Sequence, residues 1–273
     1  MLVNGEKQRT VAVMDRGFQY GDGVFETIEI HHSTPLFLAA HLARLAQGCQ
    51  QLAMPQPDMG LIRGEIAQLC LQVDNAVLKL IVTRGEGGRG YRQPEPLALT
   101  RVLSVHPLPS YPQAYYDTGI VARFCQTRLG LNPALAGIKH LNRLEQVMAR
   151  AEWSDETVQE GLMLNLSQHV IEGTMTNLFY AKQNVLYTAP IVDCGVAGIM
   201  RAWIMTQSFP VVEQYFSAQT LREADEIFVC NAIIGIWGVR ELAGRCYPIG
   251  HLTQRLQHAL AGEKQKQVAY ANI

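Results

Sequence analysis

Residues 136–147 have the sequence AGIKHLNRLEQV, in which Lys139 directly follows a Gly-Ile step. Leu141, Leu144 and Met148 recur at the spacing of one helix face. The pattern therefore predicts a helix that begins just after the lysine, with Lys139 packed and poorly hydrated at the helix entrance. Burial disfavours the charged form of a lysine, and the neutral amine is the form that attacks a carbonyl to make a Schiff base. A surface lysine that precedes a helix is the alternative.

The composition limits the class of protein. The chain has 273 residues, of which 48% are hydrophobic and 17% are charged, as expected of a soluble globular protein with a large core. Its formal net charge is −1, and no apolar run is as long as a membrane span, so we expect neither a nucleic-acid nor a membrane partner. The six cysteines lack the spacing of a metal site, and no secretory signal is recognisable. We therefore expect no metal, reduced thiols and a cytoplasmic location.

Prolines 107, 109 and 112 mark the expected domain boundary. Proline cannot donate to a sheet ladder and restricts its neighbour, so this stretch predicts a linker. We expect a smaller α/β domain over residues 1–110 and a larger domain over residues 111–273 that carries the lysine. Apolar periodicity predicts two helices in the smaller domain and a cluster of short strands in the larger one. The helices are expected over residues 38–52 and 59–73, and the strands over 161–165, 170–173, 178–181, 185–188, 226–230 and 234–241.

Three further positions could carry chemistry, although each has an ordinary structural explanation. Glu172 stands at the end of a predicted strand, where an edge charge is common. Gly198 opens a predicted helix whose first backbone N–H groups would attract an anion. Asn231 follows a buried-looking strand, and a cap of the following turn would explain it.

Taken together, these segments resemble the fold-type IV pyridoxal-phosphate enzymes. The matches are GIKHLN at 137–142, IEGTMTNLF at 171–179 and GIMR at 198–201, with further matches in DRG at 15–17, YGDGVFE at 20–26 and HLARL at 41–45. This family includes branched-chain aminotransferases, D-amino-acid aminotransferases and aminodeoxychorismate lyases. The resemblance implies a two-domain α+β fold like that of D-amino-acid aminotransferase, with mixed sheets and flanking helices. It also implies a homodimer.

The resemblance assigns roles around the reactive part of the cofactor. Lys139 would bind pyridoxal 5'-phosphate and, once displaced by the substrate, move protons as an acid and base. Glu172 would face the pyridine nitrogen and keep it protonated, so that the ring accepts electrons. Glu26 would lie close to the lysine. Some lyases of the family have threonine at this position, so Glu26 slightly favours the D-amino-acid aminotransferases.

The same resemblance assigns the phosphate site. The phosphate would rest on the backbone N–H groups of Ile199 and Met200, with Arg44 as the countercharge. Relatives often have a hydroxyl-bearing residue near Asn231 that also contacts the phosphate. The side chain is an amide in this chain.

Two segments favour the lyases within the family. One is the lysine segment, and the other is TRGEGGRGY at 83–91, whose glycines permit a tight backbone. Arg84 and Arg89 lie there, and with Arg143 they are the predicted cations for the carboxylates of the substrate. A nucleotide cradle is disfavoured because the Gly-Lys-Ser/Thr ending of a P-loop is missing. A glycine-rich hairpin with solvated arginines remains the alternative.

The expected activity is therefore the conversion of 4-amino-4-deoxychorismate to 4-aminobenzoate and pyruvate in folate synthesis. A D-amino-acid or branched-chain aminotransferase is the first alternative, because it would use the same lysine and the same carbanion. A protein that binds the cofactor without catalysis is the second alternative.

Overall fold

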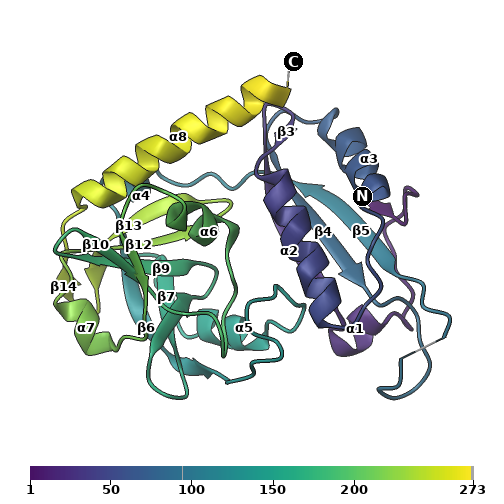
Figure 1. Cartoon of the computed structure of the whole chain (residues 1–273), viewed down its shortest axis with the longest axis horizontal. Coiled ribbons are helices and arrows are strands. Elements are labelled where there is room, and N and C mark those ends of the chain that lie inside the picture. Colours follow the sequence, from purple (N-terminus) through teal and green to yellow (C-terminus); the bar gives the residue numbers. More distant parts are fainter. Residues whose placement is uncertain (94, 272–273) are drawn as a thin grey trace. The chain divides into compact units, whose positions relative to one another are not determined.

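The computed structural model describes residues 1–93 and 95–271, which form two compact units (Figure 1). Unit 1 comprises Met1–Pro109, Ile138–Asn142 and the chain from Lys264 onward, and unit 2 comprises Ser110–Gly137 and Arg143–Glu263. The sequence leads us to expect one boundary near residue 110 and the lysine in the larger domain. The structure instead groups the lysine segment with unit 1, because its backbone pairs with a strand of that unit.

Unit 1 is built on a five-stranded antiparallel sheet with the order β1-β5-β4-β2-β3. Its strands are β1 (Leu2–Val3), β2 (Gly23–His31), β3 (Thr34–Pro35), β4 (Ala76–Thr83) and β5 (Thr100–His106). Its helices are α1 (Arg16–Tyr20), α2 (Leu38–Gln51) and α3 (Met59–Cys70), and the last residues of α8 (His251–Ala271) also belong to it. The predicted helices at 38–52 and 59–73 are thereby confirmed.

The core of unit 1 lies between its sheet and its helices. Ile28 on β2 and Leu78 and Leu80 on β4 are fully buried, and Leu45 of α2 packs into the same cluster. Val24, Thr27, Ile28 and Ile30 supply the β-branched side chains that suit a strand with one face buried. The sheet therefore gives β2 a fixed register, and β2 carries Phe25 and Glu26.

Unit 2 is built on a nine-stranded mixed sheet with the order β11-β10-β9-β12-β13-β6-β7-β8, in which β14 pairs with β13. β8 also pairs with β9, so the strands from β9 to β8 form a closed ring. A closed ring has no free sheet edge. The strands are β6 (Ile120–Leu129), β7 (Glu160–Asn165), β8 (Val170–Gly173), β9 (Asn177–Lys182), β10 (Val185–Thr188), β11 (Val211–Glu213), β12 (Glu226–Asn231), β13 (Gly235–Leu242) and β14 (Arg245–Cys246). The helices are α4 (Ala114–Asp117), α5 (Leu144–Arg150), α6 (Ile199–Met205), α7 (Ala218–Arg222) and most of α8.

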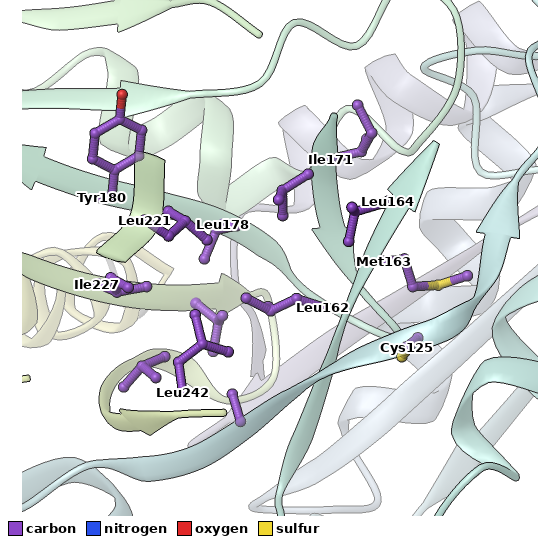
Figure 2. Packing of buried hydrophobic residues seen from close by; sticks show 14 of the residues in the cluster. Cys125, Leu162, Met163, Leu164, Ile171, Leu178, Tyr180, Leu221, Ile227 and Leu242 are labelled. Carbon is purple, nitrogen blue, oxygen red and sulfur yellow. The ribbon is translucent and has the colours of Figure 1, made fainter. Parts of the chain in front are cut away.

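Apolar side chains from several strands fill the core of unit 2 (Figure 2). Leu162 of β7, Leu178 of β9 and Ile227 of β12 have no exposed surface. The six short strands predicted between residues 161 and 241 are confirmed as β7–β10, β12 and β13. This core holds the ends of β8 and β9, where Glu172 and Asn177 face each other in register.

The prediction of a helix entrance at Lys139 is wrong. Residues 139–141 instead run antiparallel to the start of β2, and helix α5 begins only at Leu144. Two of the three residues predicted to form a buried helix face are exposed, Leu144 by 74% and Met148 by 61%. The backbone pairing with β2, which a local pattern cannot reveal, overrides the helical periodicity.

Candidate active site

Lys139 is held within unit 1 by its backbone neighbours. The Phe25 amide donates to the Lys139 carbonyl at 2.9 Å, and the Leu141 amide donates to the Gly23 carbonyl at 3.0 Å. The side chain of Lys139 is half-buried, with Nζ 4.4 Å from the centroid of the Phe25 ring. This distance is in the range of a cation–π contact. The preceding Ile138 is buried, so the lysine extends from a fixed backbone.

Glu26 binds two side chains of α2 within unit 1. Its carboxylate accepts hydrogen bonds from Arg44 Nε at 2.8 Å and from His41 Nδ1 at 2.6 Å, and Arg44 Nη2 also donates to it. Burial raises the pKa of Glu26, but Arg44 and then His41 outweigh that effect, so the pKa lies below its ordinary value. Glu26 is therefore charged at neutral pH. In the structure Glu26 orients Arg44. Its expected position close to the lysine and its contact with substrate stay predictions.

His41 is a residue that the sequence analysis quoted without giving it a role. Burial is the main effect that lowers its pKa, so the ring is neutral and donates its Nδ1–H to Glu26. Its Nε2 is buried and has no hydrogen-bond partner within the part of the chain that the structure describes. The spacing of three residues between His41 and Arg44 on one helix was the available signal, because both then lie on the same face.

Glu172 is the penultimate residue of strand β8 within unit 2, and its side chain is buried. Its Oε2 accepts a hydrogen bond from the Val196 amide at 2.8 Å, and Gln146 Nε2 donates to Oε1 at 3.4 Å. Gly195 adopts a φ of +85°, and a Cβ there would lie 3.2 Å from the Glu172 carboxylate. The carboxylate is thus fixed by backbone that passes very close to it.

Arg143 lies near the same carboxylate in unit 2. Burial lowers the pKa of its guanidinium, while the negative charges of Glu172 and Glu145 act in the opposite direction. Of the three predicted substrate arginines, Arg143 is the one that the described electrostatics associate with Glu172. The contact of Arg143 with an anionic substrate stays a prediction.

Helix α6 begins at Ile199 after the N-cap residue Gly198, which offers no side-chain cap. The first N–H groups of a helix have no partner inside the helix, so those of Ile199 and Met200 are suited to an anion. A Cβ at Gly198 would lie 2.0 Å from Asn177 Oδ1, which explains why glycine stands there. Asn177 Nδ2 also donates to the Val196 carbonyl at 2.9 Å and fixes the approach to the helix.

Asn231 has the turn-capping role that the sequence analysis left open. Its Oδ1 accepts hydrogen bonds from the amides of Ile233 and Ile234 at 2.8 and 2.9 Å. Its Nδ2 donates to the Met175 carbonyl at 3.0 Å. The side chain therefore shapes the turn between β12 and β13, and a direct contact with phosphate stays a prediction.

Arg84 is committed to structural contacts in unit 1. It is 4% exposed, and its Nε donates to Asp22 Oδ2 at 2.8 Å. Its other nitrogens donate to the carbonyls of Leu52 and Ala53 at the end of α2. These contacts give Arg84 a structural role, and its contact with a substrate carboxylate stays a prediction. Arg89 is exposed, and its contact with substrate stays a prediction.

Sequence reasoning also missed Glu160, which is fully buried in unit 2. Its carboxylate accepts hydrogen bonds from the Thr174 and Thr176 hydroxyls and from the amides of Gly161 and Thr174. Burial outweighs these donors and raises the pKa of Glu160 above its ordinary value. Nothing in the sequence around Glu160 indicated that its carboxylate is buried and hydrogen-bonded, because the hydroxyl donors come from the later turn between β8 and β9.

Lys139 belongs to unit 1 and Glu172 to unit 2. Their predicted action on one cofactor stays a prediction. Among the described residues, no group of three histidine, cysteine, aspartate or glutamate side chains could hold a metal ion. In the same part of the chain, none of the helices combines the length and apolar character needed to cross a membrane.

Comparison with known proteins identifies the family. The model of the family described as amino-transferase class IV matches residues 23–242, and the chain therefore belongs to that family. An aminodeoxychorismate lyase from Vibrio harveyi is 35% identical over 93% of this chain and 97% of its own length. The crystal structure of a 4-amino-4-deoxychorismate lyase from Pseudomonas aeruginosa is 44% identical, with a TM-score of 0.92 over 95% of this chain and 97% of that one.

An aminotransferase is also similar to the chain, at lower identity. A putative branched-chain-amino-acid aminotransferase from Methanocaldococcus jannaschii is 29% identical over 92% of this chain and 90% of its own length. The fold is thus that of the fold-type IV enzymes, with two units, mixed strand pairing and flanking helices.

Proposed function

We propose that this chain is a pyridoxal-phosphate-dependent lyase that converts 4-amino-4-deoxychorismate to 4-aminobenzoate and pyruvate. The observation that carries the proposal is the likeness, over nearly the whole chain, to two lyases of that substrate at 35% and 44% identity. The aminotransferase from Methanocaldococcus jannaschii is less similar, at 29% identity. An aminotransferase remains the second candidate, because the family model covers that class and the first reaction steps are shared.

The residues of the chain fit pyridoxal phosphate by the chemistry of their donors and acceptors. Lys139 offers an amine to the aldehyde of the cofactor. Glu172 offers a buried, backbone-held carboxylate to the pyridine nitrogen. The N–H groups of Ile199 and Met200 at an uncapped helix start offer an anion site to the phosphate. When bound, the cofactor supplies an electron sink for the carbanion of the substrate.

Lys139 moves the protons of the proposed reaction. Its neutral amine removes the proton from the substrate carbon that bears the amino group. The bond between the ring and the enolpyruvyl oxygen then breaks, and the ring becomes aromatic, which makes the elimination downhill. The ammonium of Lys139 returns the proton to the methylene carbon of enolpyruvate, which becomes pyruvate. Phe25 keeps the lysine in place through its amide and its ring.

Charged side chains orient the two anionic groups. Arg44 is the proposed countercharge of the phosphate, and Glu26 fixes its guanidinium through two of its nitrogens. Arg143 and Arg89 are the proposed cations for the substrate carboxylates. Asn231 contributes by shaping the turn between β12 and β13.

The proposed enzyme is a homodimer in the cytoplasm. Supporting the dimer, α5 exposes Leu144, Val147 and Met148, which lie on one helix face. An exposed apolar surface of this kind is typical of a protein interface. Supporting the location, all six cysteines are free thiols, as expected in a reducing compartment.

One assay tests the proposed activity. The enzyme, loaded with pyridoxal phosphate, is incubated with 4-amino-4-deoxychorismate and no keto acid, and 4-aminobenzoate is followed by its fluorescence. We expect product from the wild-type enzyme and almost none from Lys139→Ala. Exchange of D-alanine with 2-oxoglutarate in the absence of aminobenzoate would instead support an aminotransferase. Cofactor binding without any turnover would support the non-catalytic alternative.

A further inference from the structure

Two buried arginines of unit 1 share one carboxylate oxygen at the base of the glycine-rich loop, residues 85–92. The Nε atoms of Arg16 and Arg84 each lie 2.8 Å from Asp22 Oδ2, and each arginine side chain is 5% exposed. Arg84 also binds the carbonyls at the end of α2, which fixes the position of Asp22. Asp22 therefore holds the Arg16 guanidinium in one orientation.

Arg16 extends from Asp22 to the tip of the loop. Its Nη1 donates to the carbonyls of Gly90 at 3.1 Å and Arg92 at 3.4 Å, and its Nη2 donates to the Tyr91 carbonyl at 3.4 Å. Among the described residues, Arg16 is the source of the hydrogen bonds to residues 90–92. Because these contacts are with the main chain, they leave the exposed Arg89 side chain available for a ligand.

The base of the loop is fixed differently from its tip. The Arg16 amide donates to the Gly85 carbonyl at 2.8 Å. Gly85 has a φ of +84°, and a Cβ there would collide with the Ala98 carbonyl at 1.8 Å. At the tip, by contrast, a Cβ on Gly88 or Gly90 would meet no atom within 4 Å. Packing therefore secures the base, whereas the Arg16 side chain and an edge-to-face contact between the Tyr20 and Tyr91 rings secure the tip.

We propose that Arg16 is a positioning residue for the substrate. It holds residues 90–92 by their carbonyls and thereby keeps the neighbouring Arg89 in place to bind a carboxylate of an anionic ring substrate. This inference rests on the proposed function, because the lyase substrate carries two carboxylates. Without Arg16 the substrate itself would have to order the loop, and its binding would weaken while proton transfer by Lys139 would not change.

Limited proteolysis of the cofactor-loaded enzyme tests the contact with the loop. Trypsin cleaves after Arg89 and Arg92, and mass spectrometry of the fragments gives the rate of cleavage at these two peptide bonds. We expect Arg16→Gln to be cleaved there at least ten times faster than the wild-type enzyme. Arg63→Gln, which changes an exposed arginine of α3, is the control and should match the wild-type rate. Equal cleavage of Arg16→Gln and wild type would overturn the proposal.

A matched pair of glycine variants disturbs the tip while leaving the buried arginine intact. Gly90 has a φ of +84°, which strains any other residue, whereas Gly88 has no such constraint. Gly90→Ala should therefore increase tryptic cleavage at the tip, and Gly88→Ala should not. If both variants behave alike, the backbone geometry that Arg16 maintains does not matter, and the proposal fails.

Kinetics separate a positioning role from a purely structural one. For Arg16→Gln and Gly90→Ala we expect the KM for 4-amino-4-deoxychorismate to rise about tenfold, with kcat within threefold of wild type. Faster cleavage with an unchanged KM, or a loss of kcat alone, would overturn the positioning role. If the wild-type enzyme forms no 4-aminobenzoate, the proposed function fails, and the cleavage rates alone decide whether Arg16 holds the loop.

Discussion

Phe25 contacts Lys139 through both its backbone and its side chain. Its amide donates to the Lys139 carbonyl at 2.9 Å, and its ring centroid lies 4.4 Å from Lys139 Nζ. One residue of β2 therefore fixes both the backbone and the amine of the proposed catalytic lysine. The sheet of unit 1 defines the position of the lysine, although the two residues are far apart in the sequence.

Replacing the ring tests this relationship. Phe25→Leu keeps the backbone hydrogen bond but removes the contact with the amine, which is worth about 0.5–1 kcal/mol. Because this contact stabilises the ammonium and the neutral amine is the form that binds the aldehyde, we expect pyridoxal phosphate to bind about two- to fivefold more tightly, as measured by titrating the apoenzyme and following the absorbance of the bound cofactor. Phe18→Leu changes an exposed ring and is the control. Identical titration curves for Phe25→Leu and the wild-type enzyme would contradict this role.

Glu172→Gln should abolish most of the turnover while leaving the fold intact. The amide has nearly the shape of the carboxylate, but it cannot keep the ring nitrogen of the cofactor protonated. We expect 4-aminobenzoate formation to fall by about a hundredfold or more, with little change in the unfolding temperature. Glu156→Gln, at an exposed position, should leave the rate unchanged. Near-normal turnover in Glu172→Gln would remove this residue from the mechanism.

Gly198→Ala should weaken cofactor binding and lower stability. The added Cβ would lie 2.0 Å from Asn177 Oδ1, so either the helix start or the amide must shift. A clash of this kind costs about 1–3 kcal/mol, which thermal unfolding of the apoenzyme would measure. Gly262→Ala is the matched control, because its Cβ would meet no atom within 4 Å in α8. That control should be neutral or slightly stabilising. An unchanged unfolding temperature in Gly198→Ala would refute the predicted clash.

Asp22 should make the stability of the protein depend on acid pH. Burial raises the pKa of Asp22, but Arg84 and Arg16 together outweigh that effect and leave the pKa below its ordinary value of 3.8. The folded state thus gains stability from Asp22 above its ordinary pKa and loses it as the pH falls through the lower, folded-state pKa. We expect the free energy of unfolding, measured with urea from pH 7 down into the acid range, to decrease less for Asp22→Asn than for the wild type. Parallel pH profiles would show that the pKa of Asp22 is not depressed by folding.

The sequence predicted the family of this protein correctly, but it predicted the local backbone structure around Lys139 incorrectly. The segment around Lys139 indicated the family, and the family model and the similar lyases confirm it. The helix expected directly after the lysine was wrong, because the pairing with β2 comes from a distant part of the chain. Periodicity describes the residues of one segment and contains no information about such a partner.

The arginines illustrate the same limit for side chains. Arg84 and Arg89 lie in one glycine-rich stretch, and the sequence gives both of them the same role. The structure separates them, because Arg84 is buried against Asp22 while Arg89 is exposed. Arg16 was quoted in the match at 15–17 but received no role, because its contacts with residues 90–92 are to main-chain carbonyls, which every sequence has. Hydrogen-bond partners of this kind follow from the fold and are not encoded in local residue types.

The ring of strands in unit 2 closes at a single residue pair, Glu172 opposite Asn177. The same two side chains bind the two backbone groups of one residue, because Glu172 accepts from the Val196 amide and Asn177 donates to the Val196 carbonyl. The proposed acid for the pyridine nitrogen and the proposed phosphate site at the start of α6 are therefore both linked to the backbone of Val196. We therefore expect a mutation that loosens the pairing of β8 with β9 to disturb the proposed acid and the proposed phosphate site together.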